Sequence, residues 1–250
     1  MLMVNQLIGF GARRATAPAG PPPPLDGLSP TGAYSLSRDL LTSFAGNARY
    51  NGTTTASQLN DQTGAGSRNL AASPTNLTVQ TAGPNSRTSA KCDAINQQFS
   101  GSVMSNFISA TSGYYIASFL LWSAAGSNNL VFGDGNTNLG LYLQPGKLNS
   151  YNQGQWAPAL GSGFAVSTAT AYVAEWRHES GNLYCRLNGG SWSGATVSGN
   201  STLTGALNIG GKGGSGQAPI NFFEGATFST VPSTTVQDAL VADFKAWIGA

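Results

Sequence analysis

The stretch that most constrains the fold of this chain is Ala171–Asn188, with the sequence AYVAEWRHESGNLYCRLN. Side chains alternate between two sets, as on the two faces of a strand, from Tyr172 to Arg177 and again from Leu183 to Asn188. The segment Glu179–Asn182 separates the two runs. Two runs of period two around a turn that contains Gly and Asn predict an antiparallel hairpin. We expect this hairpin to lie at the centre of a β-sandwich.

The composition also favours many short strands. Charged residues make up 9% of the chain, against about 25% in an average soluble domain. Ser, Thr, Asn and Gln must therefore supply the polar surface, and these residues favour turns and strand faces over helix interiors. With 33 glycines in 250 residues, the chain suits one large all-β domain or two small ones.

Further runs predict strands on both sides of the hairpin. They are Lys91–Phe99, Tyr114–Trp122, Asn138–Leu143, Leu203–Ile209 and Ile220–Phe228. Tyr114–Trp122 is apolar almost throughout, which is typical of a strand covered on both faces. The stretch from Gly66 to Ser89 shows little periodicity, and we expect a long surface excursion with short pairings there.

The C-terminal segment from Thr235 changes to a helical period. One face of the expected helix carries Val236, Ala239, Leu240, Phe244 and Trp247. Thr234 and Gln237 fit a capping box, and Asp238 is expected in the first turn, where the helix dipole favours an acidic side chain.

Residues 1–24 predict an N-terminal arm that precedes a body of residues 25–250. Pro18–Pro24 reads PAGPPPP, a polyproline II spacer. The residues expected to bind a partner are Leu7, Ile8, Phe10, Arg13 and Arg14. A disordered tail is the alternative. Because the charges follow the apolar residues, the segment differs from a secretory signal, and we expect it to be retained.

Several partner and cofactor classes are disfavoured. The net charge is +2 without a basic run, so we expect no nucleic acid partner. No apolar run reaches the roughly 18 residues of a membrane span, so no membrane insertion is expected. His178 is the one histidine, which nearly excludes zinc, and we expect it to be a solvated turn residue. Cys92 and Cys185 could form one bridge, but two buried thiols are favoured.

Five segments together match a family pattern. They are Val173–Trp176, Leu183–Gly189 (LYCRLNG), Leu207–Gly210 (LNIG), Phe223–Gly225 (FEG) and Leu59–Gly64 (LNDQTG). Over about residues 30–250 the chain resembles the concanavalin A-like lectin/glucanase superfamily, and within it the laminin-G-like domains, although Leu59 stands where those domains carry Trp. The resemblance implies a two-sheet antiparallel jelly-roll sandwich, often closed by a helix. The head VNQLIGFGARR is similar to the start of accessory structural proteins of tailed phages.

The carboxylates do not match the hydrolytic pattern of that superfamily. Its glycosidases carry Glu-x-Asp-x-x-Glu on one strand, which brings two carboxylates close together. The nearest pair in this chain, Glu175 and Glu179, falls on a strand and a turn, so hydrolysis is not expected. Laminin-G-like domains often hold calcium. Asp134 with Asn136 is the calcium candidate, and a plain Asp-Gly turn is the alternative.

Sugar binding has better local candidates. Aromatic rings stack on the apolar faces of sugars, and amides hydrogen-bond the hydroxyl groups. The candidate ligand-binding residues are Tyr151, Asn152, Gln155, Trp156 and Trp192. The alternative is that Trp156 and Trp192 cap the core from its edges. Trp122 and Trp176 are expected inside the core.

Two functional hypotheses follow. The first is a non-enzymatic structural protein of a phage particle, made in the host cytoplasm and exposed on the virion. It would bind other virion proteins through the arm and could adhere to cell-surface glycans. The second is a lectin-like carbohydrate-binding module that is not part of a particle. Either could form homo-oligomers.

Overall fold

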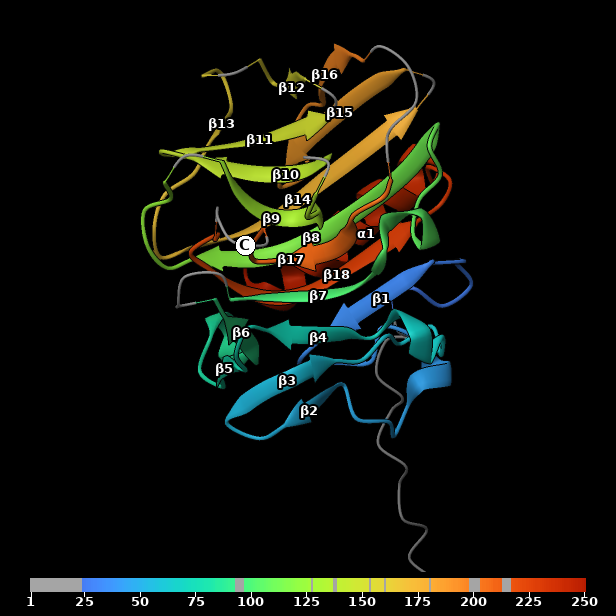
Figure 1. Ribbon diagram of the computed structural model, residues 1–250, viewed down its shortest axis with the longest axis vertical. Helices are drawn as coiled ribbons and strands as arrows, with labels where there is room; N and C mark the ends of the chain where they lie inside the picture. Colours follow the sequence, from blue (N-terminus) through green and yellow to red (C-terminus); the bar gives the residue numbers. More distant parts are fainter. Residues whose placement is uncertain are drawn as a thin grey trace, which may run out of the picture.

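The computed structural model describes residues 24–92, 97–126, 128–136, 139–152, 154–159, 161–179, 181–197, 203–212 and 217–250 (Figure 1). The strands are β1 (Gly32–Ser35), β2 (Tyr50–Gly52), β3 (Thr55–Leu59), β4 (Leu70–Ser73), β5 (Leu77–Gln80), β6 (Ser89–Lys91), β7 (Gln98–Val103), β8 (Ser112–Leu121), β9 (Asn129–Asp134), β10 (Leu139–Gln144), β11 (Lys147–Asn152), β12 (Gln155–Ala157), β13 (Phe164–Ala165), β14 (Thr170–Glu179), β15 (Asn182–Leu187), β16 (Ser193–Thr196), β17 (Ala206–Ile209) and β18 (Ile220–Phe228). The helices are α1 (Thr234–Ile248) and the short 3-10 turns Thr42–Phe44, Gly66–Arg68, Pro84–Ser86 and Met104–Asn106.

The strands form two packed sheets with antiparallel pairing. The first sheet runs β16–β15–β14–β8–β18, and β6 and β1 share the remaining edge of β18. The second runs β12–β11–β10–β9–β17–β7–β4–β3–β2, with β13 also paired to β11. Because β5 pairs with both β3 and β6, it joins the two sheets along one side. The predicted all-β antiparallel sandwich with a C-terminal helix is confirmed.

The predicted hairpin is β14 and β15, and β14 lies in the middle of the first sheet. Glu175 pairs with Arg186 across the hairpin, and Glu179 pairs with Asn182 at the turn. On its other side β14 pairs with β8 along its full length. Tyr115 of β8 stacks on Trp176 of β14 inside the core, with ring centroids 4.6 Å apart.

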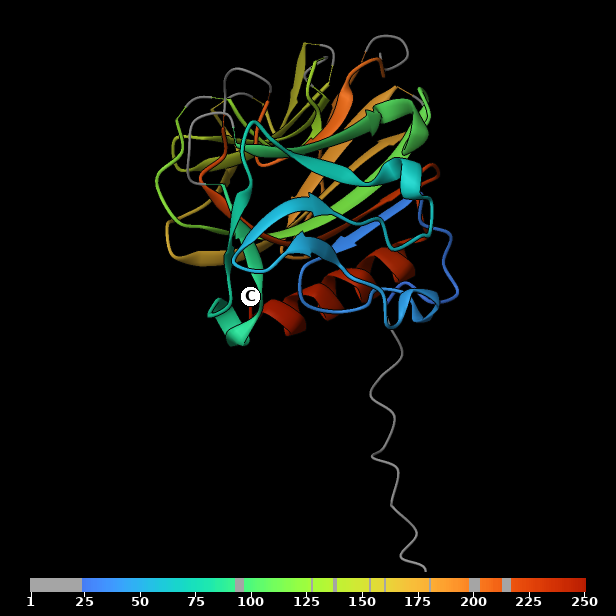
Figure 2. The same cartoon turned by 60° about the horizontal axis from the view of Figure 1, so that its bottom comes forward.

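Helix α1 covers the outer face of the first sheet, on the side away from the second sheet (Figure 2). The buried residues of the helix are Gln237, Leu240, Val241, Phe244 and Ile248. The buried face of the helix is rotated from the predicted face: Val241 and Ile248 are buried, whereas Ala239 and Trp247, which were expected there, are not. The cap also differs: the residue that caps the helix is Ser233, whose hydroxyl accepts from the N–H of Val236, so Asp238 lies beyond the first turn. Gly249, at φ 72°, ends the helix in the left-handed conformation that favours glycine.

Three local predictions are wrong. The expected strand Lys91–Phe99 is two strands in different sheets, β6 and β7, with residues 93–96 outside the described ranges. The expected surface excursion does have short pairings, in β4 and β5, but it is not a surface segment, because Leu70 and Leu77 are fully buried. Such strands of four residues are too short to show a period. His178 lies within β14 and is fully buried, because the strand continues to Glu179.

Other predictions have mixed outcomes. Cys92 and Cys185 are buried thiols that are not joined in a disulfide, as favoured. Trp176 is a core residue, whereas Trp122 is only half-buried, and its indole N–H donates to the carbonyl of Cys92. The arm residues Leu7, Ile8, Phe10, Arg13 and Arg14 lie outside the described residues, so the division at residue 24 stays a prediction. Within the described ranges, α1 is too short and polar to span a membrane.

Candidate functional site

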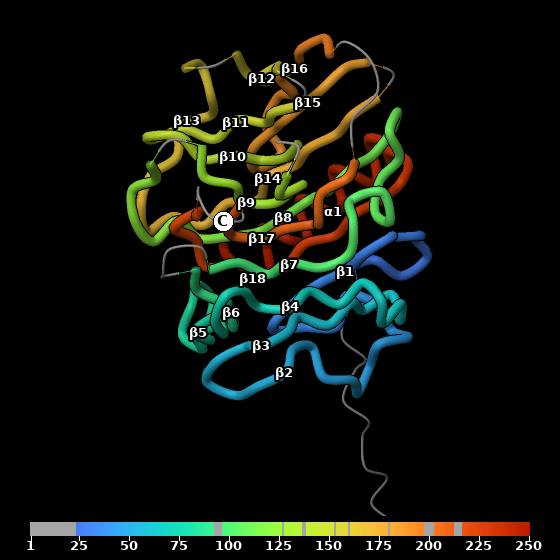
Figure 3. The backbone as a smooth tube through the Cα atoms, in the orientation of Figure 1, coloured from blue at the N-terminus to red at the C-terminus, as the bar shows by residue number. Residues whose placement is uncertain are grey.

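An aromatic cleft lies on the outward face of the second sheet. The strands that carry most of it lie at the end of the molecule opposite β2 and β3 (Figure 3). Its residues come mainly from β10, β11 and β12, where Tyr151 pairs with Trp156. The ring centroids of Tyr151 and Trp156 are 4.6 Å apart. Tyr142 meets both rings edge-on, at 6.2 Å from Tyr151 and 5.8 Å from Trp156. We call these three residues the aromatic triad.

The strand alternation explains why the triad faces outward. Leu141 and Leu143 of β10 point into the core, so Tyr142 between them points away from it. Tyr151 lies opposite Gly140, at φ 158°, where a Cβ atom would stand 2.5 Å from the carbonyl oxygen of Phe132. The close approach of β9 and β10 at this point therefore requires glycine.

The hydroxyl of Tyr142 is an unsatisfied polar group. The residue is 2% exposed, and its oxygen has no hydrogen-bond partner among the described residues. Burial raises the pKa of this phenol, and the nearby charge of Asp134 adds to the effect, so the hydroxyl keeps its proton. A buried hydroxyl without a partner is costly, and such groups occur where a ligand or water completes the bonding.

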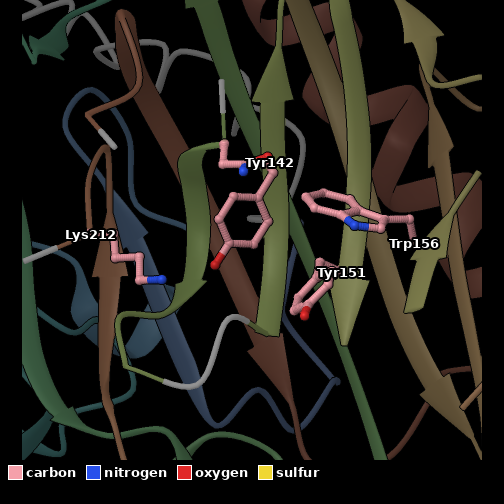
Figure 4. Close-up of a pocket in the computed structure, with 5 residues that line it drawn as sticks. Tyr142, Tyr151, Trp156 and Lys212 are labelled. Atoms are coloured by element: carbon pink, nitrogen blue, oxygen red, sulfur yellow. The ribbon is translucent and has the colours of Figure 1, made fainter. Parts of the chain in front are cut away.

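Lys212 and Asn128 complete the lining of the cleft in the described chain. Figure 4 shows Tyr142 between Lys212 on one side and Tyr151 and Trp156 on the other. The cleft has a volume of about 210 Å³, below the roughly 300–1,000 Å³ of sites for drug-sized ligands. Its size suits one ring of a longer chain molecule.

The structure brings together two of the five predicted ligand-binding residues. Tyr151 and Trp156 line the cleft, whereas Asn152 is 1% exposed and Gln155 is exposed at the end of the β11–β12 pair. Trp192 lies elsewhere: the guanidinium groups of Arg177 and Arg186 stack on its ring, and it packs against the residues under α1.

Sequence reasoning missed Tyr142, Asn128 and Lys212. A signal for Tyr142 existed, because the run Leu139–Gln144 (LGLYLQ) places one aromatic residue at an outward position between leucines. Lys212 and Asn128 lie outside the named strands, after β17 and before β9, and no pattern in the sequence links them to the cleft.

The calcium candidate is a backbone-bonded turn. Asp134 is fully buried, and its carboxylate accepts from the N–H groups of Asn136 and Gly205, at 2.8 and 3.0 Å. Among the residues that the structure describes, no group of three His, Cys, Asp or Glu side chains could hold a metal ion. The described geometry matches the alternative of a plain turn.

Two buried carboxylates lie on the other sheet, under α1. Glu175 accepts from Arg186 and, at 2.7 Å, from the hydroxyl of Tyr114; Arg186 also donates to Asp238 of the helix. Glu224 accepts from Arg38 at 2.6 and 2.8 Å, and Arg38 reaches Asp243 of the helix.

Both carboxylates are fully buried, and burial raises their pKa values against the opposing effect of the arginine bonds. Since α1 and the arginines cover Glu175 and Glu224, these groups hold the helix on the sheet and face no open cleft in the described structure.

Solved structures of two kinds of glycosidase share this fold. A Trypanosoma rangeli sialidase in complex with the inhibitor DANA matches with a TM-score of 0.61 at 15% identity, over 84% of this chain and 32% of that chain. A GH54 α-L-arabinofuranosidase soaked with a cyclic sulfate inhibitor matches with a TM-score of 0.65 at 14% identity, over 88% and 63%. The chain thus spans about a third of the sialidase and under two thirds of the arabinofuranosidase. No family model and no curated protein sequence matches this chain.

These neighbours correct the predicted function. They are a sialidase and an arabinofuranosidase, so the assignment of this fold to a non-enzymatic structural protein of a phage particle is wrong. The predicted concanavalin A-like sandwich agrees with them at the level of the β-sandwich fold, while the laminin-G-like and phage features find no support. At such low identity the likeness establishes the fold alone.

Proposed function

We propose that this chain is a carbohydrate-active domain that holds one sugar residue in the cleft of the aromatic triad. The observation that carries the proposal is the placement of the Tyr142 hydroxyl, which has no partner among the described residues, beside the rings of Tyr151 and Trp156. The rings offer an apolar platform for the C–H face of a pyranose or furanose, and the phenol offers a hydrogen bond to its hydroxyl groups. A few polar groups among aromatic rings are typical of ligand sites.

The ligands of two matched structures support a role in sugar binding in general, without indicating a particular sugar. One matched structure is a T. rangeli sialidase in complex with sialic acid, and another is an arabinofuranosidase complexed with arabinofuranosyl-α-1,2-xylobiose. Both proteins bind sugars on chains that contain a sandwich of this shape. Cleavage of a glycosidic bond is the second candidate activity, because the matched structures are glycosidases.

A binding screen with the full chain tests the proposal. The protein is applied to an oligosaccharide array, and retained sugars are measured again by calorimetric titration, with release of reducing ends followed in the same samples. We expect at least one oligosaccharide to bind, and Trp156→Ala to weaken that binding at least tenfold while the thermal unfolding midpoint changes little. Binding that Trp156→Ala leaves intact would rule out the cleft. Reducing-end release that is lost in the same variant would extend the proposal to hydrolysis.

A further inference from the structure

A second groove of the described chain is lined by side-chain amides. Its residues come from β2, β3 and the segments beside them, and these strands lie at the end of the molecule opposite β11 and β12 (Figure 3). The groove has a volume of about 410 Å³, within the roughly 300–1,000 Å³ of sites for small molecules. Half of its described lining residues carry amides, and we call it the amide groove: Asn47, Asn51, Gln58, Asn60 and Asn69.

Asn60 anchors two of the other amides. Its side-chain oxygen accepts from Nε2 of Gln58 at 2.6 Å, and its Nδ2 donates to Oδ1 of Asn51 at 3.2 Å. The same Nδ2 donates to the carbonyl of Ala48 at 2.7 Å, which ties the group to the backbone. Gln58 and Asn51 are therefore each held at one end of the amide.

The remaining two amides are anchored to the backbone directly. Oδ1 of Asn69 accepts from the N–H of Asp61 at 2.8 Å, and Nδ2 of Asn47 donates to the carbonyl of Phe44 at 2.9 Å. Since each anchor fixes the orientation of an amide before a ligand arrives, less side-chain entropy is lost on binding.

The opposite end of each anchored amide has no hydrogen-bond partner among the described residues. These free ends are two donors, Nδ2 of Asn51 and of Asn69, and two acceptors, Oε1 of Gln58 and Oδ1 of Asn47. Asn47 and Asn51 are exposed, and the half-buried Gln58 and Asn69 have no buried polar atom without a partner. A Cβ atom on Gly66 would meet no atom within 4 Å, so open space adjoins the free ends.

The groove offers no charged group to a ligand in the described structure. Asp61 is its acidic residue, but it is 3% exposed, and both of its oxygens accept hydrogen bonds from Ala33 and Thr63. A ligand that satisfies the amides is therefore neutral and must supply both donors and acceptors. Hydroxyl groups do both.

We infer that the amide groove binds a neutral sugar residue through its hydroxyl groups, as a second site that needs no contact with the aromatic cleft. The inference thus goes beyond the proposed function. Phe44, the aromatic residue of the described lining, is 8% exposed, so the groove presents no ring face comparable to those of Tyr151 and Trp156. We expect its affinity for a sugar to be about tenfold or more below that of the cleft.

The test uses the full chain with Trp156→Ala, so that the groove is measured without the cleft. Isotope-labelled protein is titrated with cellotriose, mannotriose and xylotriose, and with trigalacturonic acid and triglycine as an anion and a peptide. Nuclear magnetic resonance follows the side-chain amides of Asn51 and Asn69. Those of Asn76 and Asn106, exposed asparagines that line neither site, serve as controls.

We expect at least one neutral trisaccharide to cause saturable shifts at Asn51 and Asn69 and none at the controls. Adding Asn47→Ala and Asn51→Ala removes one free acceptor and one free donor, so the affinity measured at Asn69 should fall about tenfold or more. The matched control, which adds Asn76→Ala and Asn106→Ala instead, should bind as Trp156→Ala does. Trigalacturonic acid should bind no more tightly than the neutral sugars.

The inference would be overturned by three results: no saturable shift with any neutral trisaccharide, an affinity that Asn47→Ala and Asn51→Ala leave unchanged, or tighter binding of trigalacturonic acid. Shifts with triglycine alone would overturn it in favour of a peptide ligand. None of these results decides the proposed function, which depends on the additional affinity that Trp156 gives to the parent protein.

Discussion

The outward faces of the two sheets hold their polar groups in opposite ways. On the first sheet, both oxygens of Glu175 and of Glu224 accept bonds from buried arginines, and α1 covers them. On the second sheet, Tyr142 is equally inaccessible, yet its hydroxyl has no partner in the described structure. Buried polar groups that serve the fold are satisfied within the chain. The contrast concerns the carboxylates and Tyr142 alone, because Gln237 Oε1 and Trp192 Nε1 of the first face also have no partner among the described residues. We take the carboxylates as structural and propose that Tyr142 belongs to a ligand surface.

The largest expected loss of stability comes from removing a buried carboxylate under α1. Glu224→Gln leaves the guanidinium of Arg38 buried with only Asp243, whose side chain is 39% exposed, as its ionic partner. Removing one member of a buried ion pair costs about 3–5 kcal/mol. Urea unfolding of Glu224→Gln should show a loss of that size. The control Glu179→Gln removes a carboxylate that is 46% exposed and lies 3.8 Å from Arg177, so its midpoint should not move.

Replacing either of two buried tyrosines by Phe should change the free energy of unfolding in opposite directions. Tyr142→Phe removes an unpartnered buried hydroxyl, so we expect the free energy of unfolding to rise by about 1 kcal/mol while sugar binding weakens. Tyr114→Phe removes the donor to Glu175, and hydrogen bonds to charged groups contribute about 1.5–3 kcal/mol, so this variant should be less stable. Denaturant titration of both variants measures the difference. A loss of stability in Tyr142→Phe would show that the hydroxyl already has a partner.

The buried histidine His178 should make the stability of the protein depend on pH, with an effect smaller than that of Glu224→Gln. Burial lowers the pKa of His178 in the folded chain. The unfolded chain then binds more protons below about pH 6.5, so stability is full above that pH and falls as the pH drops. Between pH 7 and 5.5 we therefore expect the free energy of unfolding to fall, and denaturant titration at the two pH values measures the change. His178→Gln should remove this part of the pH dependence, and identical slopes in both proteins would contradict the assignment.

The smallest effect is expected at the exposed end of the ion pairs. Asp238→Asn removes a partner of Arg186 whose side chain is 57% exposed, while Glu175 still neutralises the guanidinium. Exposed pairs contribute about 0–1 kcal/mol. Thermal unfolding should therefore place this variant within about 1 kcal/mol of the parent. A loss as large as that of Glu224→Gln would mean that the helix carboxylates share the structural role.

The predictable part of the fold lies where the pattern is long. The alternation in β14 and β15, the full extent of β18 and the capped helix α1 can each be recognised within one segment. The strands β6 and β7 cannot be separated in this way, because only their pairing with β18 and β17 shows that they belong to different sheets.

The same limit applies to the cleft. Tyr151 and Trp156 are five positions apart on neighbouring strands, so their sequence already suggests a joint role. Tyr142 joins them through the pairing of β10 with β11, and Lys212 joins from outside the named strands. The position of Trp192 also depends on tertiary packing, because the arginines that stack on its ring, Arg177 and Arg186, belong to the helix-covered sheet.

The most direct test of the two-face account is a titration of two tryptophan variants with an oligosaccharide that the parent binds. Trp156→Ala and Trp192→Ala remove the same side chain from two partly buried positions. Trp156 lies in the cleft, and Trp192 packs against the hydrophobic cluster that α1 covers. The account predicts that Trp156→Ala loses at least tenfold in affinity and that Trp192→Ala binds as the parent does. Retained affinity in Trp156→Ala, or a matching loss in a folded Trp192→Ala, would contradict it.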